Sequence, residues 1–232
     1  QSMEHIMKGY LPPMDPEKLK ALFEIENAFK AGQLSADEAR LQIKQRVGKV
    51  SAYHVAYIEQ TMTEESSDEC IREDVHAIIN MLGDQIDNTL PNLPANHPIM
   101  HYLKENEEMK RLLLAVEDLV QYPMIKNQWL ELYDKISQYP LHYTRKQNQL
   151  YPVLERKGFT RPTTTMWTFD DMVRDEIREA ARLLREDQED AFIKQQERVV
   201  LYTRDLMEKE EFILYPTSMA LISEEEFEDM KS

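Results

Sequence analysis

The sequence predicts an all-α protein, with a small N-terminal helical domain followed by an antiparallel up-down four-helix bundle. Glycine is scarce, with 5 in 232 residues, and long stretches consist of Glu, Lys, Leu, Ala, Met, Gln and Arg. These residues lose the least free energy on entering a helix. No β-branched run of alternating polarity and no Asn-Gly or Asp-Gly hairpin turn occurs, so strands are not expected. Long amphipathic segments joined by short connections favour the up-down bundle.

Capping signals divide residues 3–83 into short helices. Asp15 and Pro16 supply the N-cap and the first position of the first helix. Ser35 and Glu38 form a capping box that begins the second helix. Two further helices are expected to begin after Ser51 and at Ser67 or Asp68, the last of them ending at Gly83. We therefore expect a small N-terminal helical domain over residues 3–83.

Residues 84–96 separate this domain from the longer helices that follow. The stretch contains two prolines and three asparagines and has no helical period, which marks a linker. Residues 97–222 are assigned to the bundle, and residues 223–232 to the start of a truncated acidic tail. Pro140 and Pro152 are expected to kink the second bundle helix. The expected bundle helices cover residues 97–121, 125–157, 165–186 and 190–215.

The charge balance excludes two classes of partner. Lys and Arg number 28 against 43 Asp and Glu, which gives a net charge of −15 and a pI near 4.9. An acidic surface repels phosphate backbones and anionic lipids, so neither nucleic acid nor a membrane is expected as a partner. No apolar run approaches the ~20 residues that span a bilayer, and the single Cys70 fits a reducing compartment. We therefore expect a cytoplasmic protein.

A short internal repeat relates the second and fourth bundle helices. The segment HYTRKQNQLYP at 142–152 aligns with LMEKEEFILYP at 206–216, and both end in Leu-Tyr-Pro. Positions before each Leu-Tyr-Pro are expected to face each other across the bundle core. His142 lies four residues before Lys146, whose equivalent in the second copy is Glu210.

Three histidines are candidates for metal ligands. His97 and His101 lie one helical turn apart, a spacing at which paired histidines bind zinc or iron. The alternative is that they are two partly exposed histidines at a helix start. His142 combines its position in the repeat with an expected inward face. Its alternative role is that of a buried histidine, hydrogen-bonded to Asp171 or to a tyrosine.

The repeated segment resembles the hemerythrin-like HHE cation-binding family. In that family both helices carry a histidine and then a carboxylate four residues later, ahead of Leu-Phe-Pro. Here the first copy retains the histidine, His142, but has Lys146 at the carboxylate position. The second copy retains the carboxylate, Glu210, without the histidine. Lys146 thus puts a cation where a metal ion would require an anion.

Two further segments are similar to the first and third helices of that family. KENEEMKRLLL at 104–114 has Asn106 where the family has a histidine, and TMWTFDDMVRDEIR at 165–178 has Asp171. The resemblance implies a reduced metal site made of His142, Asp171 and Glu210. It would hold iron or zinc, or the bundle would carry no cofactor at all.

The whole chain is similar to a bacterial subgroup of this family. Its members carry an N-terminal helical domain of unknown function and often a PAS-like sensor domain after the bundle. The resemblance implies a sensory or regulatory role, with a PAS-like partner domain that this chain does not contain. Apolar stripes on the short N-terminal helices would either dock on the bundle or form a homodimer interface. The segments that carry the resemblance are residues 58–78, 97–106, 142–158 and 166–179.

Three functions are compatible with these observations. The leading hypothesis is a cytoplasmic sensory or regulatory module that binds a metal or small ligand around His142. The alternative is a metal-free scaffold that retained the fold and lost the site. A di-iron enzyme acting on oxygen, peroxide or nitric oxide is disfavoured, because such sites use several His and carboxylate ligands per helix pair. The sequence has no Gly-rich phosphate loop, Gly-x-Ser-x-Gly elbow or Cys-x-x-Cys pair, so conventional nucleotide, hydrolase and zinc-finger chemistry are poorly supported.

Overall fold

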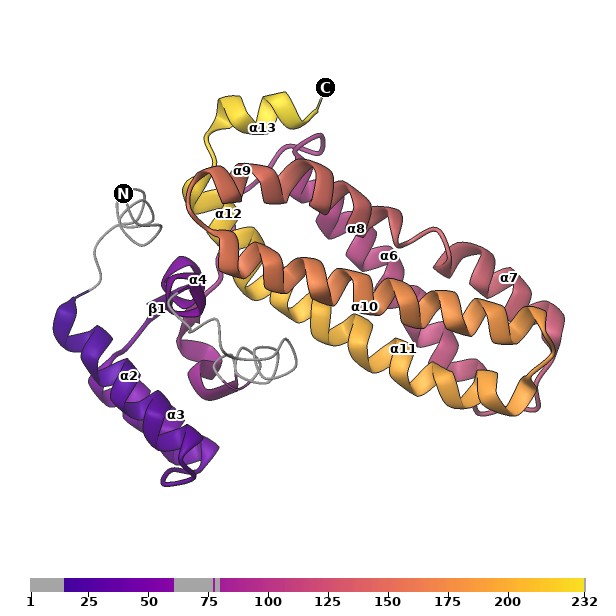
Figure 1. Ribbon diagram of the computed structural model, residues 1–232, viewed down its shortest axis with the longest axis horizontal. Helices are drawn as coiled ribbons and strands as arrows, with labels where there is room; N and C mark the ends of the chain where they lie inside the picture. The colour runs from indigo at the N-terminus through magenta and orange to yellow at the C-terminus, as the bar shows by residue number, and fades with distance from the viewer. Residues whose placement is uncertain (1–14, 61–76, 78–79, 232) are drawn as a thin grey trace. The chain divides into compact units, whose positions relative to one another are not determined.

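The computed structural model describes residues 15–60, 77 and 80–231 (Figure 1). Within these residues the regular secondary structure is helical apart from one pair of two-residue strands, which confirms the all-α prediction. The chain forms two compact units, each described here by itself. The helix expected from Ser67 or Asp68 to Gly83 lies largely outside the described residues. The boundaries 3–83, 84–96, 97–222 and 223–232 stay predictions.

The first unit contains the described residues up to Pro91, together with residues 154–165 and 212–223. Its helices begin at the caps expected from the sequence: Oδ1 of Asp15 accepts from the Glu17 N–H at 2.9 Å. Oγ of Ser35 accepts from the Glu38 N–H at 3.1 Å. The elements of this unit are α2 (Pro16–Lys30), α3 (Ala36–Arg46), β1 (Val50–Ser51), α4 (Ala52–Gln60), η1 (Gly83–Gln85), β2 (Ile86–Asp87) and α12 (Tyr215–Leu221).

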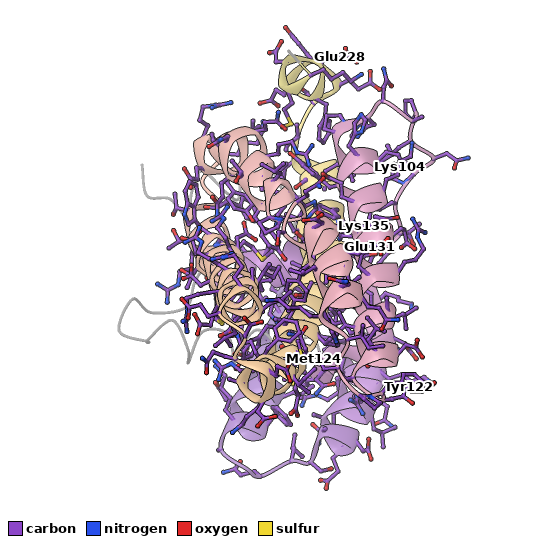
Figure 2. All side chains as sticks on the ribbon, turned by 90° about the vertical axis from the view of Figure 1, so that its right-hand side faces the viewer. Lys104, Tyr122, Met124, Glu131, Lys135 and Glu228 are labelled. Carbon is purple, nitrogen blue, oxygen red and sulfur yellow. The ribbon has the colours of Figure 1, made fainter. Side chains whose placement is uncertain are left out.

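The second unit is the helix bundle, built from residues 92–153, 166–211 and 224–231. Long helices run antiparallel to one another along its length, as the up-down prediction requires (Figure 1). Charged side chains such as Lys104, Glu131 and Lys135 lie on its outer surface (Figure 2). Its elements are α6 (Pro98–Leu119), α7 (Lys126–Ile136), α8 (Leu141–Arg145), η2 (Lys146–Leu150), α11 (Glu189–Lys209), α13 (Glu224–Met230) and most of α10 (Thr160–Arg185). Two further elements, α9 (Tyr151–Arg156) and η3 (Glu210–Leu214), have residues in both units.

The expected helix over residues 125–157 is broken rather than merely kinked at Pro140. Helix α7 ends at Ile136, and α8 begins at Leu141 directly after the proline. A proline ring lacks an N–H group and clashes with the carbonyl four residues earlier, here that of Ile136. The chain therefore leaves the helix for four residues and restarts it. This restart fixes the position of α8 and of the polar residues that it carries.

The Leu-Tyr-Pro repeat has a structural counterpart in two π-helical segments. Segments η2 and η3 each span five residues and end at the leucine of a Leu-Tyr-Pro. Pro152 and Pro216 cannot donate a hydrogen bond to the carbonyl four residues earlier, and a π-bulge accommodates this loss within a continuous helix. Lys146 and Glu210 are the first residues of η2 and η3, and both side chains are completely buried. The two copies therefore share backbone geometry as well as sequence.

Candidate functional site

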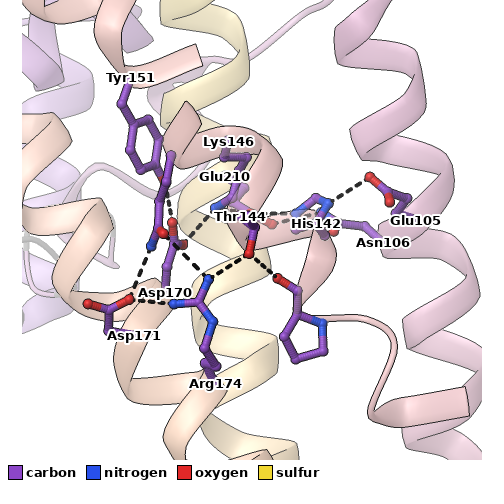
Figure 3. Close-up of polar contacts among 12 residues, drawn as sticks. Glu105, Asn106, His142, Thr144, Lys146, Tyr151, Asp170, Asp171, Arg174 and Glu210 are labelled. Atoms are coloured by element: carbon purple, nitrogen blue, oxygen red, sulfur yellow. Dashed lines mark hydrogen bonds and ion pairs between the residues drawn. The ribbon is translucent and has the colours of Figure 1, made fainter. Parts of the chain in front are cut away.

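Five polar side chains meet inside the bundle at the level of the π-helical segments (Figure 3). They come from α6, α8, η2, α10 and η3, and each has a relative exposure of 0%. Complete burial removes them from water, so every charge among them needs a partner within the protein. We call this group the polar core; its members are Asn106, His142, Lys146, Asp170 and Glu210.

Lys146 supplies the central cation of the polar core. Its Nζ donates to Oδ1 of Asp170 at 2.7 Å and forms a second ion pair with Oε2 of Glu210. The ammonium group also lies over the rings of Tyr143 and Tyr151, 5.1 and 5.6 Å from their centroids. Burial alone would lower the pKa of Lys146, but the two carboxylates outweigh burial and raise it. The side chain therefore remains an ammonium ion.

Glu210 is the most heavily bonded carboxylate of the core. Its Oε1 accepts from Nδ2 of Asn106 at 2.9 Å, and its Oε2 lies 2.8 Å from Nε2 of His142. Burial would raise the pKa of Glu210, but the charges of Lys146 and His142 lower it to about 2. Glu210 is thus an anion at all ordinary pH values.

Asp170 is the second carboxylate that contacts Lys146. Besides the lysine, it accepts a hydrogen bond from the hydroxyl of Tyr151, with 2.6 Å between that oxygen and Oδ2. Burial and the nearby charge of Glu210 outweigh the attraction of Lys146 and raise the pKa of Asp170 to about 6. The two carboxylates therefore shift in opposite directions, because Glu210 has more cationic and amide donors around it.

His142 lies between two carboxylates. Its Nδ1 is 3.1 Å from Oε1 of Glu105, and its Nε2 contacts Glu210. An ionised carboxylate only accepts hydrogen bonds, so both contacts are satisfied when the ring carries a proton on each nitrogen. The ring of Tyr139 stacks on the imidazole with 5.0 Å between centroids and 14° between planes. The imidazole is therefore held by a carboxylate at each ring nitrogen and by the stacked ring of Tyr139.

The orientation of the Asn106 amide is fixed by its two neighbours. Its oxygen accepts from the hydroxyl of Tyr139 at 2.7 Å, while its nitrogen donates to Glu210. Reversing the amide would place its NH₂ group on the tyrosine hydroxyl and its oxygen on the carboxylate. Asn106 therefore acts as a hydrogen-bond bridge between the stacked tyrosine and Glu210.

Two of the residues predicted for the site are brought together and one is not. His142 and Glu210 are in direct contact, in the region that the repeat pointed to. Asp171 lies beside the core instead: its side chain is 49% exposed and bonds to Arg174 at 2.5 Å. It also accepts from Gln147 at 3.2 Å. His142 bonds to Glu105 and Glu210 and not to Asp171.

Sequence reasoning missed Asp170, although a signal for it exists. The buried residues of α10 that follow an apolar stripe are Met166, Phe169, Val173 and Ile177. Asp170 lies four residues after the first of these and three before Val173, which puts it in the centre of the stripe. Asp171 lies about 100° further around the helix, toward solvent. The helical period therefore selects Asp170 as the inward carboxylate.

His97 and His101 are separate from the polar core. His97 is the N-cap of α6, and its Nδ1 accepts from the Ile99 N–H at 3.1 Å. Its ring packs on Phe227 with 4.4 Å between centroids, and burial lowers its pKa. His101 is exposed on the first turn of the same helix. These contacts agree with the helix-start alternative, and a metal bound by this pair stays a prediction.

The polar core does not fit a bound metal ion. The donors that converge there are His142, Asp170 and Glu210, but the ammonium group of Lys146 already lies between the two carboxylates. A divalent cation placed among these oxygens would be repelled by this fixed charge at close range. Across the described ranges, no group of three or more His, Cys, Asp or Glu side chains is arranged to hold a metal ion.

Comparison with known proteins identifies one family. The model of the hemerythrin HHE cation binding domain matches residues 97–218, which include every residue of the polar core. No curated protein matches the chain. In the part of the chain that the structure describes, no helix is long and apolar enough to cross a membrane.

Proposed function

Because the chain belongs to the hemerythrin HHE cation-binding family but has a lysine at a ligand position, we propose that it is a metal-independent regulatory module that acts by binding another protein. The observation that carries this proposal is the contact of one ammonium group, Nζ of Lys146, with both Asp170 and Glu210. In this account the lysine supplies within the chain the positive charge that a metal ion supplies elsewhere in the family.

Electrostatics explains why the substitution leaves a stable bundle. Two buried carboxylates without a cation would carry a large desolvation cost, which a paired and hydrogen-bonded cation offsets. Lys146 meets this need: its ammonium group donates to Asp170 and lies over the rings of Tyr143 and Tyr151. The fold then depends on no external ion. Where other members of the family bind a cation, this chain forms an ion pair between its own side chains.

The same geometry argues against the di-iron enzyme. Oxygen, peroxide or nitric oxide chemistry at such a site needs several ligands and an open coordination position. Here the inward groups are engaged with one another, and the centre is taken by Lys146. We therefore propose a role in regulation, in the cytoplasm, that depends on the surface of the bundle. The acidic net charge of −15 and the resemblance to sensory proteins support this proposal.

Metal analysis of untagged protein tests the proposal. The protein would be expressed in iron- and zinc-replete medium, and its metal content would be compared with that of the His142→Ala variant. We expect substoichiometric metal in both proteins and a lower stability in the variant, because the substitution removes a hydrogen-bond partner of Glu210. Stoichiometric metal in the wild-type protein that is lost in His142→Ala would refute the proposal and restore the metal-sensor hypothesis.

A further inference from the structure

An apolar groove of about 450 Å³ lies between α6 and α11. Val116 contributes to it from the last turn of α6, Val120 from the C-cap directly after α6, and Val200 and Leu201 from the middle of α11. Leu201 is 57% exposed and Val120 is 37% exposed, so these side chains are open to solvent. Adjacent exposed apolar side chains with a polar border mark interaction sites on soluble proteins.

The border of the groove is acidic. Glu117, Glu197, Asp205 and Glu208 line it, together with a single basic residue, Arg204. That guanidinium is already bonded to Glu117, whose Oε2 lies 2.9 Å from Nη1. The lining therefore carries a net negative charge around an apolar floor.

We propose that this groove binds an amphipathic helix of a partner protein, with an apolar stripe on one face and Lys or Arg on its flanks. The inference rests on the proposed function, since it names the partner class of a protein-binding module. Amphipathic helices commonly bind by placing their apolar face in a hydrophobic groove. Basic flanks would meet the carboxylates of Glu197, Asp205 and Glu208, which gives complementary charge and faster association.

The acidic border of the groove disfavours the other possible occupants, because they are also acidic. A second copy of this chain would bring a net charge of −15 and the same acidic border, so the two grooves would repel each other. The helix α13, with the sequence EEEFEDM, is acidic and would be repelled as well. Anionic lipid and nucleic acid are disfavoured for the same reason. A basic helix from a different protein has the complementary charge.

Binding of designed peptides tests the inference. The probe is a labelled Leu/Lys peptide of about 18 residues, or five helical turns, with leucine at helical spacing. One comparison peptide has glutamate in place of each lysine, and a second has the same composition in scrambled order. The wild-type protein, as a full chain, should bind the first peptide in fluorescence anisotropy and bind the other two much more weakly.

Matched variants locate the binding to the groove. Leu201→Glu changes the apolar floor of the groove, and Glu197→Lys changes its acidic border. Each substitution should weaken the binding of the Leu/Lys peptide by about tenfold or more. The controls are Leu114→Glu, at a 61% exposed position of α6 outside the groove, and Glu131→Lys on α7. Glu131→Lys changes the net charge by the same amount as Glu197→Lys. Both controls should leave the affinity within about twofold.

Three results would overturn the inference. The first is that the scrambled peptide binds as tightly as the Leu/Lys peptide, or that the control variants lose as much affinity as the groove variants. Either result would indicate attraction by net charge alone. The second is no binding of the Leu/Lys peptide. The third is a dimer in sedimentation that Leu201→Glu dissolves, which would make a second copy the occupant. Metal analysis of the same samples separates the two proposals: stoichiometric metal refutes the metal-independent module, while failed peptide binding by metal-free protein refutes the groove alone.

Discussion

Lys146 and Asp170 form an ion pair that is completely buried, with 2.7 Å between Nζ of the lysine and Oδ1 of the aspartate. A second carboxylate, that of Glu210, contacts the same ammonium group. Such a cluster is stable only as a whole, since removal of one partner leaves a charge without compensation in a low-dielectric environment. Stability measurements on its members therefore test the account most simply.

Replacing the lysine by a side chain of similar length without charge should be costly. Lys146→Met leaves two buried carboxylates without their cation, and we expect the free energy of unfolding to fall by about 3–5 kcal/mol. Urea denaturation followed by circular dichroism measures this change. The control is Lys104→Met, at an exposed position of α6, which should change the value by less than about 0.5 kcal/mol. Equal effects of the two substitutions would show that the buried cation is not needed.

The two adjacent aspartates of α10 should behave very differently. Asp170→Ala removes a partner from both Lys146 and Tyr151, so a loss of about 3 kcal/mol or more is expected. Asp171→Ala removes a half-exposed ion pair with Arg174, which is worth less than about 1 kcal/mol. Thermal unfolding of the two variants in parallel gives the comparison. A larger loss for Asp171→Ala would contradict the placement of Asp170 as the core carboxylate.

The contrast between these aspartates also shows what the sequence could and could not predict. Helix positions followed from caps and periodicity, because these signals are local to the chain. The resemblance to the family pointed to Asp171, whereas the apolar stripe that includes Met166 and Val173 selects Asp170. A shift of one position along a helix turns a side chain by about 100°, so alignment alone could not decide between neighbours. The helical period could have done so.

The connection of Lys146 to two carboxylates could not be predicted from the sequence. The repeat indicated that Lys146 and Glu210 lie at equivalent positions, but π-helical segments set their final directions. A π-bulge depends on how a proline is accommodated in its tertiary surroundings, and local propensity does not determine it. His142 was expected to face inward, which the structure confirms. Its bond to Glu105 depends on the packing of α8 against α6.

The pH dependence of the free energy of unfolding should reflect the titration of Asp170. Its pKa is raised from 3.8 to about 6, so the folded state binds a proton more tightly than the unfolded chain does. This contribution to stability is complete below about pH 4 and is lost as the pH rises through about 6. Relative to Asp170→Asn, the wild-type protein should lose roughly 2 kcal/mol between pH 4 and pH 7. Urea titrations at several pH values measure the difference.

Glu210 provides a control of opposite sign for the same experiment. Its pKa is lowered from 4.5 to about 2, so its contribution is present above pH 4.5 and is lost as the pH falls toward 2. The difference between wild type and Glu210→Gln should therefore shrink with acidification, while the difference involving Asp170→Asn should move the other way. If the two differences in stability changed with pH in the same direction, the opposite pKa shifts of these carboxylates would be contradicted.

The central claim, that Lys146 takes the place of a metal ion, is tested most directly by the Lys146→Glu variant. This substitution places a carboxylate among His142, Asp170 and Glu210, which together offer the donors that Zn²⁺ and Fe²⁺ prefer. Without metal the variant carries unbalanced buried anions and should be less stable than the wild type. The measurement is the melting temperature of both proteins with excess EDTA and with added Zn²⁺ or Fe²⁺. We expect the metal to raise the melting temperature of Lys146→Glu, because a ligand that binds only the folded state stabilises it, and to leave the wild type unchanged. A wild-type melting temperature that rises with metal and falls with EDTA would contradict the claim.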